Sequence, residues 1–321
     1  MRLALAGYGR LGVTILSSIL NNTSCEVVAV LQNGRATKPW KRPFSLLFSR
    51  IAGGKDNIAK YALKHRIPVI WINRMTPDEL QPLKELLPDI IITSGFSIIF
   101  KKQLLSLPRI GCINVHSSLL PNHRGPNPFS AVILQGESES GVTFHIMDEG
   151  IDTGPIIAQE RFPITESDTA YTVYCKASEL AGKMVPQVLA KIEREGLIGV
   201  PQDNEIATYD PKPTLKDALI RWDVPAIHID RQVRALSQII MPRFIYKRKT
   251  VFVSKVQVNR ANTSYPPGTV MNPNYPAEIA TAEGSVKLIS AFTLFPFPRL
   301  WPKKGLLKIG DSILIEDTPY E

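Results

Sequence analysis

The order of apolar and helical stretches at the start of the chain constrains the fold more than any other feature. An apolar run at residues 3–6 is followed by closely spaced glycines, by a helical stretch that continues through residues 17–20 and by a second apolar run at residues 26–31. A strand, a helix and a strand in this order predict a parallel pair with a right-handed crossover. Further apolar runs lie at residues 68–71, 90–94 and 111–116. The first part of the chain is therefore expected to be α/β, with a parallel sheet.

The glycines of this opening, Gly7, Gly9 and Gly12, have the spacing of a dinucleotide-binding turn, in which the start of a helix faces a pyrophosphate. Such sites also use an acidic residue near the end of the second strand to bind a ribose hydroxyl. Residues 30–33 read Val-Leu-Gln-Asn, so that acid is missing. The turn is expected either to receive a substrate phosphate or, as the favoured interpretation, to pack the helix tightly on the strand.

The prolines at positions 201, 211 and 213 mark the end of this pattern. Regular structure is expected to break here, which predicts a first domain over residues 1–200, a linker over residues 201–207 and a second domain over residues 208–321. A helix is expected around residues 227–236. Short alternating apolar runs follow at residues 250–258, 268–271, 278–282, 285–294 and 311–315. Short strands at this spacing, separated by turns, predict a small β-barrel.

The second domain carries the excess of positive charge. Residues 231–308 contain 13 of the 38 Lys and Arg residues but only 2 of the 29 acidic residues, which leaves 25 basic and 27 acidic residues in the rest of the chain. A basic module on a nearly neutral body favours a polyanionic partner, with tRNA as the first candidate. A solvated basic face without a partner is the alternative.

The sequence gives no sign of a membrane segment or a disulfide framework. No run of 18 or more apolar residues is present, and the apolar start is too short before Gly7 to be a secretory signal. The three cysteines are scattered without CxxC spacing, which suits reduced thiols better than disulfides or a cysteine-bound metal. We therefore expect a cytoplasmic protein with no metal site and no membrane partner. The sequence carries no indication of oligomeric state.

Candidate functional residues gather around the apolar run at residues 111–116. Alternation along this predicted strand places Asn114 and His116 on the same face. Ligands of α/β sheets bind beyond the carboxyl ends of the strands, and a glycine-flanked loop with Asp148 and Asp152 could bring a carboxylate into the same crevice. Each residue alone also has a structural interpretation, because strand-end Asn and His often satisfy local hydrogen bonds and an Asp can shape a turn.

Together these side chains suit the transfer of an acyl group to an amine. Asn114 and His116 can donate hydrogen bonds to the oxyanion that forms, and Asp152 can orient and charge the imidazole or relay a proton through water. A covalent nucleophile has little support, since the sequence has no GxSxG segment and no cysteine in a recognisable catalytic motif.

The same segment resembles the 10-formyltetrahydrofolate-dependent formyltransferases. Their hallmark is Asn-x-His, then Ser-Leu-Leu-Pro, Arg-Gly and a later Met-Asp-x-Gly-x-Asp-x-Gly. Every part is present in order, at Asn114, at His116, at residues 118–121, at Arg124-Gly125 and at residues 147–154. The resemblance implies a Rossmann-like parallel-sheet formyltransferase domain followed by a small OB-like β-barrel. It also implies 10-formyltetrahydrofolate as the formyl donor and catalytic roles for Asn114, His116 and Asp152.

Two groups of binding residues are implied by the same resemblance. The expected folate pocket contains Ser94, Gly95, Phe96, Ser97, Ile98, Asp148, Gly150 and Ile151. The expected substrate-binding residues are Ser118, Leu119, Leu120, Pro121 and Arg124, together with Arg35, Lys38, Lys41 and Arg42 of a basic loop that would hold phosphates. His123 and His145 lie nearby in the sequence and are expected to be structural.

Within the family, the basic tail and the stretch at residues 210–222 resemble the methionyl-tRNA formyltransferases, which implies the amino group of initiator methionyl-tRNA as the acceptor. Two segments differ from those enzymes. The loop at residues 33–43 is basic and similarly placed but has a different sequence, and residues 126–129 read Pro-Asn-Pro-Phe in place of small residues. An N-formyltransferase for a nucleotide-linked amino sugar or another small amine is the alternative within the family. An alternative of another class is a non-catalytic RNA-binding protein that uses only the tail.

Overall fold

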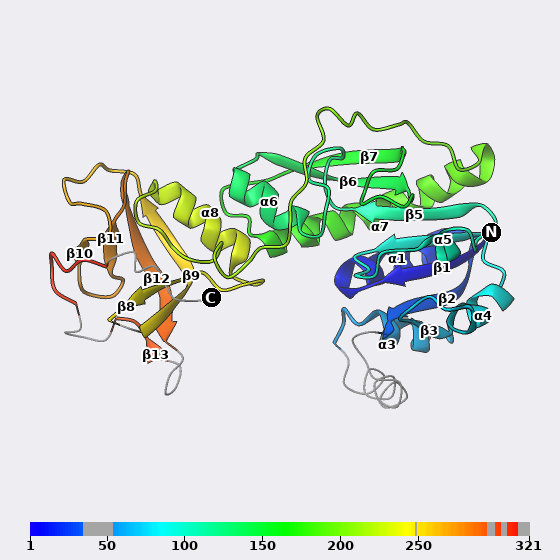
Figure 1. Cartoon of the computed structure of the whole chain (residues 1–321), viewed down its shortest axis with the longest axis horizontal. Helices are drawn as coiled ribbons and strands as arrows, with labels where there is room; N and C mark the ends of the chain where they lie inside the picture. The colour runs from blue at the N-terminus through cyan, green and yellow to red at the C-terminus, as the bar shows by residue number, and fades with distance from the viewer. Residues whose placement is uncertain (35–53, 248, 294–298, 303–306, 314–321) are drawn as a thin grey trace. The chain divides into compact units, whose positions relative to one another are not determined.

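The computed structural model describes residues 1–34, 54–247, 249–293, 299–302 and 307–313, which form two compact units, each with its own sheet (Figure 1). The first unit comprises Met1–Pro128, Glu139–Ile164 and Thr172–Asp210, and the second comprises Phe129–Ser138, Thr165–Tyr171 and Pro211–Glu321. Residues 201–207, for which the sequence predicts a linker, belong to the first unit.

The first unit is built on a seven-stranded sheet with the order β3-β2-β1-β4-β5-β6-β7. Its parallel strands are β1 (Arg2–Gly7), β2 (Glu26–Asn33), β3 (Val69–Ile72), β4 (Ile90–Ser94) and β5 (Gly111–His116). The chain crosses from one half of this sheet to the other between β3 and β4, so that β1 lies between β2 and β4. The predicted Rossmann-like parallel sheet is confirmed for these five strands.

Two antiparallel strands that the sequence did not predict complete the sheet. β6 (Glu139–Ile146) pairs with β5, and β7 (Ile156–Pro163) pairs with β6, both antiparallel. Residues 147–155 join β6 to β7, and a connection of this length is too short for the helical crossover that parallel strands need. The loop that carries Asp148 and Asp152 is therefore the loop of a β-hairpin.

Helices cover both faces of this sheet. They are α1 (Gly9–Asn22), α3 (Ile58–Lys64), α4 (Pro77–Glu85), α5 (Lys102–Leu105) and most of the long helix α7 (Ala170–Glu195). Leu83 of α4 and Leu104 of α5 are fully buried in one core cluster with Ala4, Ala6 and Ile91 of the strands. Burial of an aliphatic side chain of this size contributes roughly 1.5–3 kcal/mol. None of the helices described is long and apolar enough to cross a membrane.

The glycine-rich turn before α1 packs that helix against α7. Gly9 has a φ of +60°, and a Cβ atom at this position would lie 2.7 Å from the hydroxyl oxygen of Tyr174. That hydroxyl accepts a hydrogen bond of 3.0 Å from the backbone N–H of Leu11, one of the first amides of α1. A side chain of the protein thus occupies the place at the helix start where a phosphate would bind. The arrangement agrees with the favoured interpretation of the glycine spacing, which is close packing.

The second unit contains an antiparallel sheet with the order β10-β11-β12-β9-β8, and β13 pairs with β12. Its elements are α6 (Pro128–Gln135) except for its first residue, α8 (Ala226–Leu236), β8 (Arg243–Tyr246), β9 (Lys249–Asn259), β10 (Val270–Asn272), β11 (Glu278–Ala280), β12 (Ser285–Thr293) and β13 (Arg299–Leu300). Trp222 is fully buried in its core and meets Phe244 edge-on at 5.3 Å, and Phe244 meets Trp301 in the same way at 5.2 Å. The curled sheet confirms the predicted OB-like domain. Of the strand predicted at residues 311–315, Ser312 forms an isolated bridge with Thr269, and residues 314 and 315 lie outside the described residues.

Candidate active site

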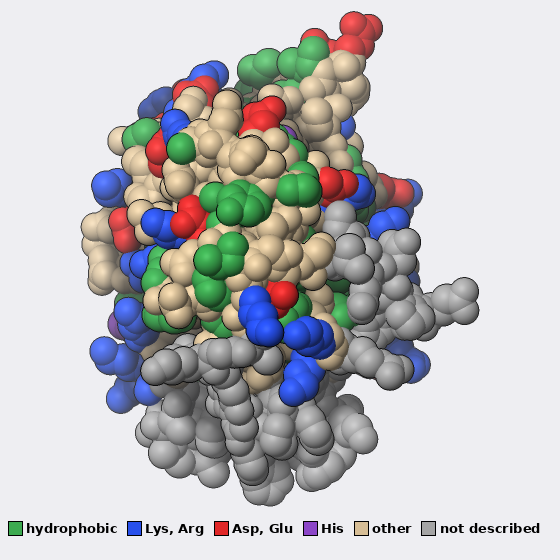
Figure 2. Space-filling view, turned by 90° about the vertical axis from the view of Figure 1, so that its left-hand side faces the viewer, with side chains coloured by type: hydrophobic (Ala, Val, Ile, Leu, Met, Phe, Trp, Pro, Cys, Tyr) green, Lys and Arg blue, Asp and Glu red, His purple; other side chains and the backbone are tan. Residues whose placement is uncertain are grey.

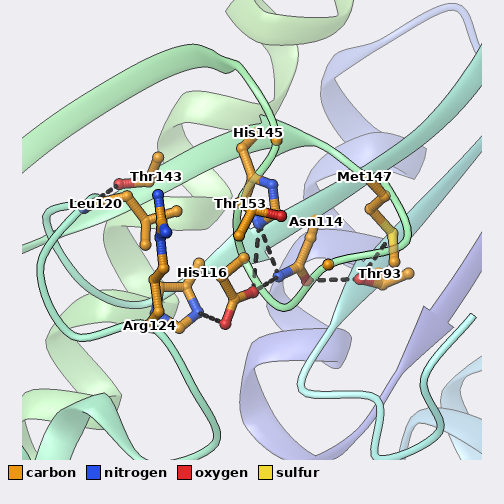
Figure 3. Close-up of polar contacts among 12 residues, drawn as sticks. Thr93, Asn114, His116, Leu120, Arg124, Thr143, His145, Met147 and Thr153 are labelled. Carbon is orange, nitrogen blue, oxygen red and sulfur yellow. Dashed lines mark hydrogen bonds and ion pairs between the residues drawn. The ribbon is translucent and has the colours of Figure 1, made fainter. Parts of the chain in front are cut away.

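The registers of three neighbouring strands bring polar side chains together around β5. Asn114 of β5 lies opposite Thr93 of β4 and opposite His145 of β6, and His116 lies opposite Thr143 of β6. Figure 3 shows Thr93, Asn114 and His145 linked by a continuous series of polar contacts. The predicted placement of Asn114 and His116 on one face agrees with their shared contact with the Asp152 carboxylate.

All three polar positions of the Asn114 side chain have partners. Its nitrogen lies 3.0 Å from Asp152 Oδ1 and 3.1 Å from His145 Nε2, and its oxygen lies 2.5 Å from the hydroxyl of Thr93. Because a carboxylate only accepts hydrogen bonds, the nitrogen must face Asp152 and the oxygen must face Thr93. The amide is held in one orientation, with both of its N–H donors aimed at the side of β5 where Asp152 lies.

The imidazole of His116 is fixed in one tautomer when it is neutral. Its Nε2 lies 2.8 Å from the backbone oxygen of His123, which only accepts, so Nε2 carries the proton. Its Nδ1 lies 3.5 Å from Asp152 Oδ2 and is free to take up a proton. Burial lowers the pKa of His116, and the facing carboxylate of Asp152 opposes this shift. The side chain, 6% exposed, is therefore a neutral base at neutral pH.

Asp152 is the charged centre of the site. One carboxylate oxygen accepts from Asn114, and the other accepts from the backbone N–H of Gly125 at 2.9 Å. Burial alone would raise the pKa of Asp152. In acid, where Asp152 titrates, the protonated rings of His145 and His116 outweigh burial together with the Gly125 N–H, and they lower this pKa to about 2. The residue also has a φ of +55°, a left-handed conformation that costs a non-glycine residue of the order of 1 kcal/mol.

Sequence reasoning missed two members of this cluster. His145 was expected to be structural, yet its Nε2 lies 3.4 Å from Asp152 Oδ1 as well as 3.1 Å from Asn114. Its Nδ1 donates to the backbone oxygen of Ile146, so the neutral ring accepts from Asn114. Thr93 directly precedes the predicted folate residues 94–98 and was not predicted. The signal for both is strand register, because each lies opposite Asn114 on a neighbouring strand.

The residues predicted for the folate pocket lie on two segments that adjoin this cluster. Ser94 is fully buried with its hydroxyl close to Gly7, Ile98 is buried, Phe96 is half-buried, and Gly95 and Ser97 are exposed. On the hairpin loop, Asp148 accepts from the backbone of Gly150 at 3.0 Å and from the Thr153 hydroxyl at 2.7 Å, which shapes the loop. Ile151, on the same loop, is 43% exposed.

The residues predicted to bind the acceptor are largely committed to internal contacts. Ser118 is fully buried and donates to the backbone oxygen of Asn122 at 2.8 Å, and Leu120 is buried between half-buried Leu119 and Pro121. Arg124 is 9% exposed and donates to the side chains of Gln202 and Asn204. The predicted basic residues Arg35, Lys38, Lys41 and Arg42 lie outside the described residues.

Comparison with known proteins places the chain in a family. Residues 55–189 match the Formyl transferase family, and residues 213–292 match the Formyl transferase C-terminal domain. The chain is 30% identical over 268 residues to the methionyl-tRNA formyltransferase of Legionella pneumophila (strain Paris), a match that covers 81% of this chain and 84% of the relative.

Solved structures share the fold at lower identity. WlaRD, a sugar 3N-formyl transferase solved in the presence of dTDP and 5-N-formyl-THF, is 23% identical with a TM-score of 0.65, over 92% of this chain and 99% of that chain. An N-formyltransferase from Helicobacter canadensis, solved with folinic acid and dTDP-3-aminofucose, is 22% identical with a TM-score of 0.63, over 89% and 98%. The chain belongs to the folate-dependent formyltransferase family, and it is an N-formyltransferase whose formyl donor is 10-formyltetrahydrofolate.

Proposed function

We propose that this enzyme formylates the amino group of methionyl-tRNA. The observation that carries the proposal is the match to a methionyl-tRNA formyltransferase over 81% of the chain, together with the match to the family's C-terminal domain at residues 213–292. The acceptor would thus be a large polyanion, for which the basic second unit is suited.

The segments beside the cluster fit a folate. Ile99, which follows β4, is 64% exposed, and Ile151, on the hairpin loop, is 43% exposed, so both segments present apolar side chains to solvent. Phe96 packs partly against the core of the sheet. Apolar surface of this kind suits a flat pterin ring. We propose that residues 94–98 and the loop with Asp148, Gly150 and Ile151 hold the donor.

10-Formyltetrahydrofolate supplies the formyl carbon, and its N10 leaves with a proton as the acceptor nitrogen loses one and becomes a formamide. His116 Nδ1 accepts the proton of the amine, since its other nitrogen is held by the His123 carbonyl. Asp152, 3.5 Å away, stabilises the imidazolium that results. The proton can then pass from His116 to the departing nitrogen.

Asn114 stabilises negative charge on the formyl oxygen. Of its two N–H groups, one donates to the Asp152 carboxylate, and a hydrogen bond to a charged acceptor is the stronger kind. The other donates to the neutral ring of His145 and costs less to redirect toward substrate. Asn114 thus acts as the oxyanion donor, while Asp152 and Thr93 keep its amide plane fixed.

Exposed basic residues of the second unit would contact the phosphates of tRNA. Lys247, Lys249, Lys255, Arg260 and Lys308 are exposed. Of these, Arg260 also forms an ion pair of 3.0 Å with Glu166. Arg234 is less available, because it bonds to Asp230 and to the backbone of Asp168. On the face shown in Figure 2, Lys and Arg side chains lie in several groups with acidic side chains between them. Such a dispersed distribution favours several separate phosphate contacts over one deep anion site.

The test is a formyl-transfer assay with 10-formyltetrahydrofolate, comparing charged methionyl-tRNA with nucleotide-linked amino sugars at matched salt. We expect the tRNA to be formylated with a kcat/KM at least about 100-fold above that of any sugar, because only the tRNA offers a long run of phosphates to the basic second unit. Turnover with the sugars alone would reject the tRNA proposal and leave the roles of Asn114, His116 and Asp152 to be tested on the sugar reaction. Deacylated tRNA as an inhibitor provides the control for binding without chemistry.

A further inference from the structure

Residues 202–210, which follow the last strand and helix of the first unit, run along the active site. The backbone of Thr208 bonds to Pro121 and Arg124, and that of Asp210 bonds to Arg124. The side chain of Thr208 accepts from the backbone N–H of His123 at 2.8 Å. A segment without helix or strand is therefore tied by several hydrogen bonds to the loop that supplies the carbonyl partner of His116.

The Gln202 side chain of this segment makes four hydrogen bonds with residues of the site. Its oxygen accepts two hydrogen bonds from Arg124, at 2.8 Å from Nη2 and 3.2 Å from Nε. Its nitrogen donates to the backbone oxygens of Asp152 at 2.8 Å and Gly154 at 2.7 Å. The single amide thus joins the hairpin loop that carries Asp152 to a buried guanidinium.

The backbone of Asp152 needs such support. Its left-handed φ of +55° is unfavourable for a residue with a side chain, and conformations of this kind persist only where the surroundings fix them. Gln202 bonds to the carbonyl oxygen of Asp152 itself and to that of Gly154, two residues further along the same turn. These bonds act on the backbone that aims the carboxylate at Asn114 and His116.

We propose that Gln202 is a positioning residue for formyl transfer, which holds the Asp152 carboxylate against Asn114 and His116 through the backbone of the hairpin loop. The proposal rests on the proposed catalytic roles of these three residues and not on the identity of the acceptor. Gln202 bonds to the backbone oxygen of Asp152 and not to a carboxylate oxygen, so its removal acts on the position of the carboxylate. A displacement of about 1 Å at a catalytic group can cost about 100-fold in rate.

Two substitutions test separately the bonds of Gln202 to the hairpin loop and the hydrogen bonding of Arg124. In Gln202→Glu the side chain still accepts from Arg124 and gains an ion pair, but it cannot donate to the two carbonyl oxygens. In Asn204→Ala one bond to Arg124 is lost, while Gln202 keeps all of its own. Both proteins are compared with wild type for kcat, for KM of donor and acceptor, and for thermal unfolding, using whichever acceptor the wild-type enzyme turns over.

We expect Gln202→Glu to lower kcat about 10- to 100-fold with both KM values within about threefold of wild type, and Asn204→Ala to stay within about twofold. A kcat of Gln202→Glu within threefold of wild type would overturn the proposal. Equal losses in the two variants would do the same, because the Arg124 end of the contact would then be the important one. Gln202→Leu, which lacks all four bonds, should match Gln202→Glu in kcat. The wild-type rate is measured first with each acceptor. A lack of activity on tRNA would therefore reject the proposed acceptor without affecting the test of Gln202.

Discussion

The side-chain nitrogen of Asn114 lies 3.0 Å from Asp152 Oδ1, and the imidazole of His116 lies 3.5 Å from Asp152 Oδ2. One carboxylate thus orients the proposed oxyanion donor with one oxygen and the proposed base with the other. The two functions depend on each other, because a movement of Asp152 disturbs both.

Replacement of Asn114 by Ala should lower kcat by about 100- to 1000-fold, the usual loss when an oxyanion donor is removed. It should also destabilise the first unit by about 1–3 kcal/mol, because Thr93 and the Asp152 carboxylate lose a buried partner. Steady-state kinetics and urea unfolding measure the two effects. Asn122→Ala is the control, since Asn122 is exposed and only its backbone oxygen is used by Ser118. Wild-type kcat in Asn114→Ala would rule out the proposed role.

Stability should fall in acid as Asp152 takes up its proton. Its pKa is about 2 in the folded protein against an ordinary value of 3.8. A carboxyl whose pKa is lowered by folding stabilises the fold at every pH above its pKa in the unfolded chain. This contribution is lost as the pH falls from about 4 to 2. It amounts to about 2 kcal/mol for this side chain, which is 12% exposed. Urea unfolding across this pH range should be flatter for Asp152→Asn than for wild type. Glu149→Gln, an exposed change in the same loop, should follow the wild-type curve.

The rate should rise with pH through the pKa of the acceptor amine. The attacking amine must be neutral, and burial lowers the pKa of His116, which favours the neutral form of this base. A pH profile of kcat/KM measures this rise. With a second acceptor of lower amine pKa, the rise should move to lower pH by the difference between the two amine pKa values. If kcat/KM rises over the same pH range with both acceptors, the titrating group belongs to the enzyme and not to the amine.

The packing of Tyr174 on Gly9 predicts a difference between two glycine substitutions. Gly9→Ala and Gly196→Ala both place a side chain at a positive φ, but only the new methyl group at Gly9 meets another atom, the Tyr174 hydroxyl, at 2.7 Å. Gly9→Ala should therefore cost about 1–3 kcal/mol more in urea unfolding than Gly196→Ala, as Tyr174 must move and release the Leu11 N–H. Equal costs would mean that the tyrosine adapts without loss.

Formylation of tRNA should depend steeply on salt. If the exposed lysines and arginines of the second unit neutralise two or more phosphates, KM for tRNA should rise about tenfold or more for a fourfold increase in monovalent salt. Changing Lys249 and Lys255 of β9 together to Gln should lower this slope while kcat stays near wild type. An unchanged slope would remove these residues from the tRNA contact.

The sequence was informative where short-range rules apply. Strands β4 and β5 begin and end where the apolar runs predict, since buried parallel strands read as continuous apolar segments. The shared face of Asn114 and His116 follows from alternation along one strand. The antiparallel strands β6 and β7 were not predicted. The loop that joins them was interpreted as a binding loop, because its composition suits a binding loop as well as the turn of a hairpin.

The remaining parts of the site depend on contacts between residues distant in sequence. His145 joins the cluster through the register of β6 on β5, because Asn114 and His145 lie 31 positions apart in the sequence, with α6 between them. Gln202 lies in a proline-marked segment that composition describes only as irregular. No local pattern distinguishes its amide from that of an exposed loop residue.

The path of residues 202–210 also bears on where this enzyme could be divided. A fragment that ends at residue 200 would keep every strand and helix of the first unit. It would lose Gln202, which bonds to the Asp152 loop, and Thr208 and Asp210, which bond to His123. A fragment that ends at Asp210 keeps them. The shortest piece with a complete fold and the shortest piece with an ordered catalytic centre would therefore be different lengths of the same chain.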